Sequence, residues 1–247
     1  MKVLRELKDD AFAVTRLVEV DGRRWLLKEY RFRTPLGRWL APLARRQAQH
    51  EMAVGRLLQG LEGVPGEPVR VSDTSFRRPW IDGEDLRVHL RRGGSLPDDF
   101  FDRLEALVRE IHARGVAYAD LQKKDNVIVG RDGRPWLIDF QISLRPRDGG
   151  ALRRLRRWWL RHTQSDDLRH VYKHKRRIRP DLLTPEEDAA SRRRSPVSWL
   201  KRVFYALTLR RVKRWIYPHG SDDTFRFSKA WRDRDATPRR RPPGPPG

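Results

Sequence analysis

Cysteine is absent from this chain of 247 residues. Without thiols, neither a disulfide framework nor a thiolate metal site can form. Long apolar runs are also missing, because the longest uncharged stretches, such as Trp39–Ala44 and Val203–Leu209, are far shorter than the ~20 residues that span a bilayer. Residues 1–10 contain no apolar run and do not resemble a secretory signal. We therefore expect a soluble, cytoplasmic protein.

Acidic residues are scarce in the last two-fifths of the chain. Residues 1–143 hold 26 Lys and Arg against 22 Asp and Glu, whereas residues 144–247 hold 29 against 11. Most of the net charge of +22 therefore lies in the second segment, which should attract phosphate-rich surfaces of lipid or nucleic acid. Arg outnumbers Lys by 45 to 10, as a GC-rich coding sequence would produce, but such a bias does not explain the uneven distribution.

The first third of the chain predicts antiparallel strands and one helix. The residues expected on one face of an early strand are Phe12, Val14, Val18 and Val20. Asp21-Gly22 then supplies a hairpin turn, and Arg24–Tyr30 returns as a strand. Arg45–Gly60 predicts a helix, with Met52, Val54, Leu57 and Leu58 as its apolar side. Trp80–Gly83 is a candidate hinge between two lobes.

Helices dominate the rest of the chain. Pro97–Arg114 is strongly amphipathic, and Gly115 follows as a C-terminal cap. Two short apolar strands are expected at Val127–Val129 and Trp136–Ile138. The chain then looks helical and basic to about Tyr217, and the Pro/Gly/Arg-rich end after Thr237 should be disordered.

The densest chemistry lies in residues 118–143. Asp120 follows a helix and a turn, Asn126 leads into one short strand, and Asp139 ends the next. A hairpin would bring Asn126 and Asp139 together, and two oxygen ligands suit a hard cation such as Mg²⁺. Asp120 would lie nearby, where it could accept a proton from an incoming hydroxyl. Phosphoryl transfer needs these parts together with a cation for the phosphates.

This segment resembles the catalytic loop and the metal-binding motif of the protein-kinase-like superfamily. Tyr118-Ala119-Asp120-Leu121 stands where His-Arg-Asp-Leu usually does, and Asp139-Phe140-Gln141 resembles Asp-Phe-Gly. Asn126 matches the metal-binding Asn and precedes Asp139 by thirteen residues, the usual kinase spacing. The resemblance implies ATP and Mg²⁺ as cofactors and an α+β, bilobal fold with a small antiparallel β-rich N-lobe and a mainly helical C-lobe. The implied divisions are residues 1–83, 84–217 and a basic tail at 218–247.

Other parts of the kinase set occur in the expected order. Lys28 resembles the β-strand Lys that contacts the α- and β-phosphates, and Glu51 is the carboxylate expected to pair with it. Leu26 shares a strand face with Lys28, so Leu26 would cover the adenine, while Ile81 lies in the hinge that would contact it.

Three departures from the kinase pattern matter. No glycine precedes Gly22, so the glycine-rich phosphate loop is missing. Asp120 and Asn126 are six residues apart rather than five, and we therefore assign Lys123 as the loop cation that faces the γ-phosphate. Gln141 replaces the flexible glycine after Asp139-Phe140.

Each candidate also has a structural alternative. Asp120 and Asn126 could be turn residues, and Asp139 could cap a turn. Lys28 could lie on an exposed strand face, and Glu51 on a solvated helix face. Asp139 nevertheless follows a buried apolar strand, where a carboxylate without a partner would be costly, and this favours metal binding.

The acceptor is less well defined by the sequence. No Ala-Pro-Glu sequence or long activation segment follows Ser143. Leu152–Arg161 segregates as a helix, with Leu and Trp on one side and Arg on the other, and Trp199–Leu209 repeats the theme. Tryptophan beside arginine suits the headgroup region of an anionic membrane, although these helices could instead pack on the core.

Among kinase-like families the sequence looks most like the bacterial kinases of the lipopolysaccharide core, which act on Kdo or heptose. This resemblance implies a sugar hydroxyl as acceptor and peripheral association with the inner face of the bacterial inner membrane. Two alternatives remain open: an atypical protein Ser/Thr kinase resembling the RIO group, which would contact RNA and is less favoured, and a pseudokinase without catalysis.

Overall fold

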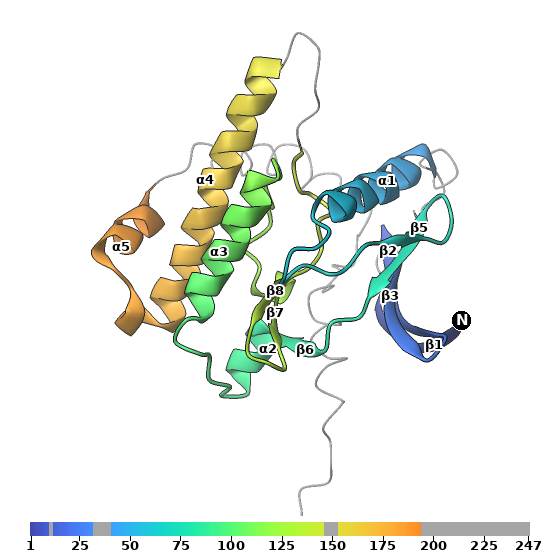
Figure 1. Cartoon of the computed structure of the whole chain (residues 1–247), viewed down its shortest axis with the longest axis horizontal. Helices are drawn as coiled ribbons and strands as arrows, with labels where there is room; N and C mark the ends of the chain where they lie inside the picture. Colours follow the sequence, from blue (N-terminus) through green and yellow to red (C-terminus); the bar gives the residue numbers. More distant parts are fainter. Residues whose placement is uncertain (10–11, 32–40, 146–152, 194–247) are drawn as a thin grey trace, which may run out of the picture.

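The computed structural model describes residues 1–9, 12–31, 41–145 and 153–193. An antiparallel sheet at the N-terminal end is followed by a mainly helical part, so the architecture is α+β (Figure 1). This arrangement is compatible with a bilobal kinase-like fold. The boundaries 1–83 and 84–217 remain predictions, and the tail at 218–247 lies outside the described residues.

The N-terminal sheet has five strands in the order β1-β2-β3-β5-β4, and all neighbours are antiparallel. The strands are β1 (Lys2–Asp9), β2 (Ala13–Val20), β3 (Arg23–Tyr30), β4 (Val69–Arg70) and β5 (Ser75–Pro79). Helix α1 (Ala41–Leu57) packs on this sheet through a cluster that includes Ala48, Met52 and Phe76.

The turn between β2 and β3 is the one that the sequence predicts. Asp21 and Gly22 both have positive φ angles, 51° and 69°. A two-residue loop of this kind matches the right-handed twist of its two strands. It fixes the register from Val20 opposite Arg23 to Ala13 opposite Tyr30, and so sets where Lys28 lies in the sheet.

Two details of the predicted lobe are wrong. In β2, Val14 and Val18 are buried, but Ala13 and Leu17, which have the opposite parity, are buried as well, and Phe12, just before the strand, is 42% exposed. Both faces of this strand are covered, so a single apolar face does not describe it. Helix α1 begins at least four residues earlier than predicted and ends at Leu57, which is exposed.

The C-terminal part combines a three-stranded sheet with six helical segments in the described residues, four α-helices and two short 3₁₀ turns. The order along the chain is β6 (Gly83–Asp85), α2 (Leu86–Arg91), α3 (Phe100–Ala113), η1 (Lys124–Asn126), β7 (Val127–Gly130), β8 (Pro135–Leu137), α4 (Arg153–Ile178), η2 (Pro180–Leu182) and α5 (Pro185–Arg192). The η segments are single 3₁₀ turns. The sheet order is β6-β7-β8, and both pairings are antiparallel.

Helix α3 confirms the amphipathic prediction for Pro97–Arg114. Its six predicted apolar residues are all buried, and they belong to the largest core cluster: Phe100, Phe101, Leu104, Leu107, Val108 and Ile111. The chain reverses at Gly115, which has a φ of 76° that favours glycine. The following residues therefore turn back towards the core and enter the loop that carries Asp120.

Helix α4 is much longer than the predicted Leu152–Arg161 segment. It lies between α3 and α5 (Figure 1), and buried Lys175 donates hydrogen bonds to Asp102 of α3 and Glu187 of α5, both at 2.8 Å. Trp199–Leu209 falls outside the described residues. Across the described ranges, no helix combines the length and apolar character needed to cross a membrane.

Candidate active site

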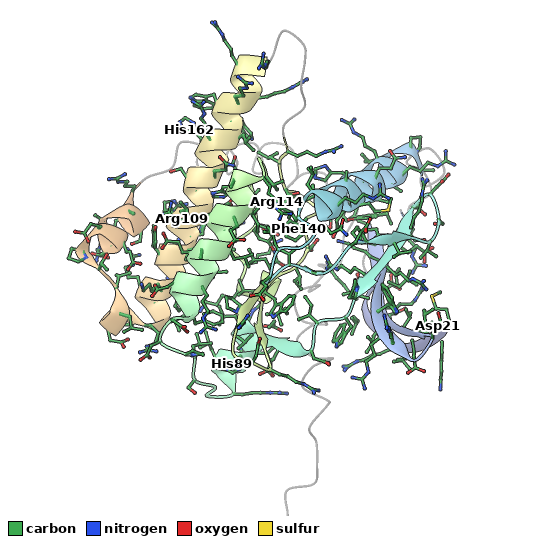
Figure 2. The ribbon with its side chains drawn as sticks, viewed as in Figure 1. Asp21, His89, Arg109, Arg114, Phe140 and His162 are labelled. Atoms are coloured by element: carbon green, nitrogen blue, oxygen red, sulfur yellow. The ribbon has the colours of Figure 1, made fainter. Side chains whose placement is uncertain are left out.

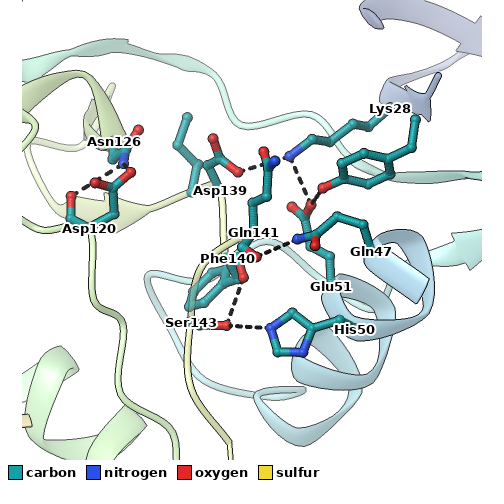
Figure 3. Close-up of polar contacts among 12 residues, drawn as sticks. Lys28, Gln47, His50, Glu51, Asp120, Asn126, Asp139, Phe140, Gln141 and Ser143 are labelled. Atoms are coloured by element: carbon teal, nitrogen blue, oxygen red, sulfur yellow. Dashed lines mark hydrogen bonds and ion pairs between the residues drawn. The ribbon is translucent and has the colours of Figure 1, made fainter. Parts of the chain in front are cut away.

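Lys28 lies at the centre of an ionic cluster formed by three separate elements. Its Nζ donates to Oε2 of Glu51 on α1 and to Oδ1 of Asp139, which follows β8, and both distances are 2.8 Å (Figure 3). The hydroxyl of Tyr30 also donates to Glu51 Oε2. Lys28 and Glu51 are buried, at 5% and 3% exposure. The structure thus brings together three of the predicted site residues.

The charges in this cluster stabilise one another. Burial alone would lower the pKa of Lys28, but Asp139 and Glu51 outweigh it and hold the pKa well above its usual value. Burial would raise the pKa of Asp139, but the ammonium of Lys28 and the guanidinium of Arg78 hold it well below its usual value. The expectation of a carboxylate without a partner at Asp139 is therefore wrong, because Lys28 pairs with it and 34% of its side chain is exposed.

Asp120 forms a second polar group in the loop between α3 and β7. Its Oδ2 accepts from Lys123 Nζ at 2.7 Å and from Asn126 Nδ2 at 2.9 Å. Its Oδ1 is buried and has no hydrogen-bond partner among the described residues. Burial raises the pKa of Asp120, whereas Lys123 and Asn126 oppose this shift. Lys123 therefore pairs with Asp120 here, and its side chain is 56% exposed.

The β7–β8 hairpin places Asn126 beside the start of the Asp139 segment. Ile138 N donates to Asn126 O at 3.1 Å, and Figure 3 shows the side chains of Asp120, Asn126 and Asp139 at this end of the hairpin. The 3₁₀ turn η1 accommodates the extra residue between Asp120 and Asn126. Because the amide nitrogen of Asn126 is used by Asp120, its amide oxygen is left to act as a ligand.

Leu26 and Ile81 line one apolar pocket between the two sheets. The other lining residues are Pro65, Arg78, Pro79, Trp80, Gly83, Ile128 and Ile138. The pocket has a volume of about 30 Å³, which is about the share of one water molecule and far below that of a typical ligand pocket. The two predicted adenine contacts are therefore brought together, but a purine fits only if this pocket widens.

Comparison with known proteins relates the chain to protein kinases. A stretch of 75 residues is 32% identical to the sperm motility kinases 2B and 2A of Mus musculus. It covers 29% of this chain and only 15% of the length of either relative. No protein-family model matches the chain. The similarity supports a protein-kinase-like relationship, and it gives no support to the narrower resemblance to lipopolysaccharide-core kinases.

Asp167 of α4 holds the kinase-like loop and was not predicted from the sequence. Its carboxylate is buried and accepts from the backbone N–H groups of Tyr118 at 2.7 Å and Ala119 at 2.8 Å, and from His112 Nε2 at 3.1 Å. Ala119 has a φ of 69°, a conformation that costs a non-glycine residue about 1–2 kcal/mol. Asp167 therefore stabilises the strained backbone just before Asp120. A usable signal existed, because Asp166 and Asp167 are the only acidic residues in α4.

The segment after Asp139 is also fixed by contacts that the sequence did not indicate. Gln47 of α1 donates to the backbone oxygen of Gln141, and Ser143 Oγ lies 3.3 Å from His50 Nε2 of α1 (Figure 3). Helix α1 thus contacts this segment at two points beyond the Lys28 cluster. In this structure Gln141 has a defined place against α1, where the kinase motif has a flexible glycine.

Arg78 of β5 is the other site residue that sequence reasoning missed. It is buried, and its Nη1 lies 3.6 Å from Glu51 Oε1. Cross-strand pairing places Arg78 opposite Leu26, so it borders the narrow pocket. Lys28 therefore contacts Oε2 of Glu51, and Arg78 lies near Oε1 of the same carboxylate. The sequence around Arg78 shows only short strand signals. It therefore does not indicate which residue of β3 lies opposite Arg78, or which face of the sheet its side chain occupies.

His174 gives α4 a second contact with the loop and makes stability depend on pH. It is buried, and its Nε2 lies 2.8 Å from Leu121 O, so a neutral ring can donate this bond. Burial lowers its pKa to about 4, whereas an unfolded chain titrates near pH 6.5. The unfolded state therefore binds more protons between these values, and stability falls as pH drops from about 6.5 to 4, by roughly 3 kcal/mol.

We expect His174→Asn, which keeps a donor but does not titrate, to lose less unfolding free energy than the wild type between pH 7 and pH 5. Urea unfolding at the two pH values measures the difference. Burial also lowers the pKa of His170 to about 4, so His170 contributes a loss of the same sign to both proteins, although His174 adds to its shift in the wild type alone. Equal losses in the two proteins would contradict the role of His174.

Proposed function

We propose that the protein is an ATP-dependent phosphotransferase that moves the γ-phosphoryl group to a hydroxyl. The observation that carries the proposal is the joint placement of Lys28, Glu51 and Asp139 in one ionic cluster, with Asp120 and Asn126 at the adjacent hairpin end. These residues come from four separate parts of the chain, and an ordinary fold has no need to gather them. The similarity of a 75-residue stretch to kinases supports the same conclusion.

Lys28 is suited to bind phosphate oxygens because it stays charged and is held in place. Glu51 fixes its ammonium from one side, and the hydroxyl of Tyr30 and the guanidinium of Arg78 fix Glu51 in turn. A cation held in this way can orient an α- or β-phosphate without losing further conformational entropy. In the proposed complex, Leu26 and Ile81 contact the adenine after the pocket between the sheets has widened.

Asp120 is suited to take the proton of the acceptor hydroxyl. One oxygen is occupied by Lys123 and Asn126, while Oδ1 has no partner among the described residues. Because Oδ1 is buried, the loop must open locally before this oxygen can accept that proton. Burial raises the pKa of Asp120, which strengthens the carboxylate as a base. The side chain of Lys123 is 56% exposed, so in the proposed complex it can turn from Asp120 to a phosphate in the solvent-facing site.

Asn126 and Asp139 would hold the metal ion. In the described residues no three His, Cys, Asp or Glu side chains converge on one point, so the site offers two protein ligands. Two are enough for Mg²⁺, which prefers to keep water and phosphate oxygens in its shell. The low pKa of Asp139 keeps this carboxylate anionic, as a ligand must be. When bound, Mg²⁺ neutralises charge on the β- and γ-phosphates.

We therefore predict that Asp139→Ala removes the dependence of ATP binding on Mg²⁺. The wild type should bind ATP at least tenfold more tightly with Mg²⁺ than with EDTA, and the variant should show no such difference. Isothermal titration measures both affinities. Asp132→Ala, in the exposed β7–β8 turn, is a matched control that should keep the Mg²⁺ effect. An undiminished Mg²⁺ effect in Asp139→Ala would refute this assignment of the metal site.

For the acceptor, we propose a hydroxyl of a glycolipid, of the lipopolysaccharide-core type, rather than a protein side chain. The observation behind this choice is that only eight residues separate Leu144 from the start of α4 at Arg153, which is little chain for an extended peptide-binding segment. The kinases that match a part of this chain favour the alternative, a protein hydroxyl. The two acceptors are distinguished by experiment.

The decisive experiment offers labelled Mg-ATP to the purified full chain, together with either lipopolysaccharide-containing membranes or soluble cell protein. Label in the glycolipid that is absent with Asp120→Asn would support both the chemistry and the acceptor. Label found only in protein would support phosphoryl transfer but show that the acceptor is a protein hydroxyl rather than a glycolipid. ATP binding without any transfer would favour a pseudokinase. The narrow pocket and the missing glycine-rich loop are consistent with that alternative.

A further inference from the structure

The N-terminal half of α4 carries a surface that the proposed chemistry does not use. The first turns of the helix extend beyond α3 (Figure 1), and the side chains there point away from the fold (Figure 2). Two large apolar side chains are exposed on it, Leu155 at 57% and Trp158 at 44%. We refer to this surface as the α4 docking face; it consists of Arg153, Arg154, Leu155, Arg157, Trp158, Trp159 and Arg161.

Apolar and cationic side chains are segregated around this part of the helix. At 3.6 residues per turn, Leu155, Trp158 and Trp159 lie on one side, and the four arginines lie on the other. The ring of Trp158 packs on that of His162 with centroids 4.1 Å apart, and it lies 6.1 Å from Trp159. The aromatic patch is therefore ordered before any partner arrives.

The charges of the α4 docking face are not paired with other described residues. Within the described part of the chain, Arg153, Arg154, Arg157 and Arg161 form no ion pair. In the second half of the same helix the pattern is opposite, since Arg169 pairs with Asp166 at 2.6 Å and Lys175 pairs with Asp102 and Glu187. The four arginines of the first turns are therefore available to an anionic partner.

We propose that the α4 docking face attaches the protein to an anionic membrane surface. Exposed Leu155 and Trp158 would enter the boundary between headgroups and acyl chains, and the arginines would lie at the level of the lipid phosphates. Trp158 and Trp159 could also stack on the bases of a single-stranded nucleic acid, but exposed Leu155 offers no ring and is better accommodated by acyl chains. This inference goes beyond the proposed chemistry and does not depend on phosphoryl transfer.

The test compares binding of the full chain to vesicles of phosphatidylcholine alone and of phosphatidylcholine mixed with phosphatidylglycerol. We expect co-sedimentation with the anionic vesicles only. Leu155→Ser combined with Trp158→Ser should lower the partition coefficient by about tenfold or more. Each Arg→Gln change at 153, 154, 157 or 161 should lower the partition coefficient by about fivefold, because one cationic side chain near an anionic surface raises that coefficient by about this factor.

Leu43→Ser is the matched control, since Leu43 is 49% exposed on α1, away from α4, and its loss should leave binding unchanged. Raised salt screens the attraction between charges, so the binding that remains there measures insertion of Leu155 and Trp158. Circular dichroism confirms that the exposed changes leave the fold intact.

Equal binding by wild type and the Leu155/Trp158 double variant would overturn the proposal, as would failure of the wild type to bind anionic vesicles. Binding to poly(U) RNA without binding to vesicles would also overturn it and favour a nucleic-acid partner. Mg-ATP affinity, measured without vesicles, tests the proposed function separately and should be the same in the wild type and the double variant.

Discussion

Replacing Asp120 with Asn should lower the rate of phosphoryl transfer by about 10²–10⁴-fold, the usual contribution of a positioned general base. Asn is nearly the same size and can still accept hydrogen bonds from Lys123 and Asn126, so the loop keeps its shape. It cannot, however, take a proton from the acceptor hydroxyl at Oδ1. Because Lys28 and Asp139 are untouched, binding of Mg-ATP should persist.

The stability of Asp120→Asn distinguishes this loss from misfolding. Burial raises the pKa of Asp120, so the folded state binds a proton more readily than the unfolded state does. The ionised carboxylate therefore costs stability above its folded pKa, and the neutral amide removes that cost. We expect the variant to unfold at the same temperature as the wild type or at a higher one, measured by thermal denaturation.

The pH dependence of the rate gives an independent check on the same residue. Asp120 must be ionised to accept a proton, so transfer should fall as pH drops through its folded pKa. An exposed Asp titrates near pH 4. Because the pKa of Asp120 is raised, the rate should begin to fall at a higher pH than it would for an exposed Asp. The residual activity of Asp120→Asn should lack this acidic limb. A variant as active as the wild type would refute the assignment of Asp120.

The parts that could be predicted from the sequence are those set by local patterns. Asp21 and Gly22 favour the positive φ angles of a tight turn. This turn fixes the register of β2 and β3 around Lys28. Spacing along α3 determines its buried face. The resemblance to kinase motifs also implied that Lys28, Glu51, Asp120 and Asp139 share one site, and the structure brings them into two adjacent polar groups.

Apart from the Lys28–Glu51 pair, which the kinase resemblance implies, the contacts between distant segments could not be predicted. That Lys28 pairs with Asp139 depends on how the two sheets meet, and neither segment encodes it. Asp167 lies in a helix whose composition indicates only a basic surface, and its role exists only because α4 packs against the loop at Tyr118 and Ala119. The exposure of Phe12 likewise results from which faces of β2 are covered.

Asp167→Ala should therefore produce the largest loss of stability among the changes considered, together with a loss of activity. The substitution leaves the backbone N–H groups of Tyr118 and Ala119 without their acceptor, and an unsatisfied buried donor costs about 1–3 kcal/mol. We expect the unfolding free energy to fall by roughly 2–5 kcal/mol in urea titrations. The strained backbone at Ala119 is then free to relax, which would displace Asp120.

A displacement of about 1 Å can lower an enzymatic rate about 10²-fold, so transfer by the folded fraction of Asp167→Ala should fall by about this factor. The neighbouring variant Asp166→Ala separates this effect from general damage to α4. Asp166 is also buried, but it pairs with Arg169 on its own helix and makes no bond to the loop. It should lose stability and keep its rate per folded molecule. If both variants lost the rate equally, the position of Asp120 would depend on α4 as a whole, and Asp167 would have no specific part in it.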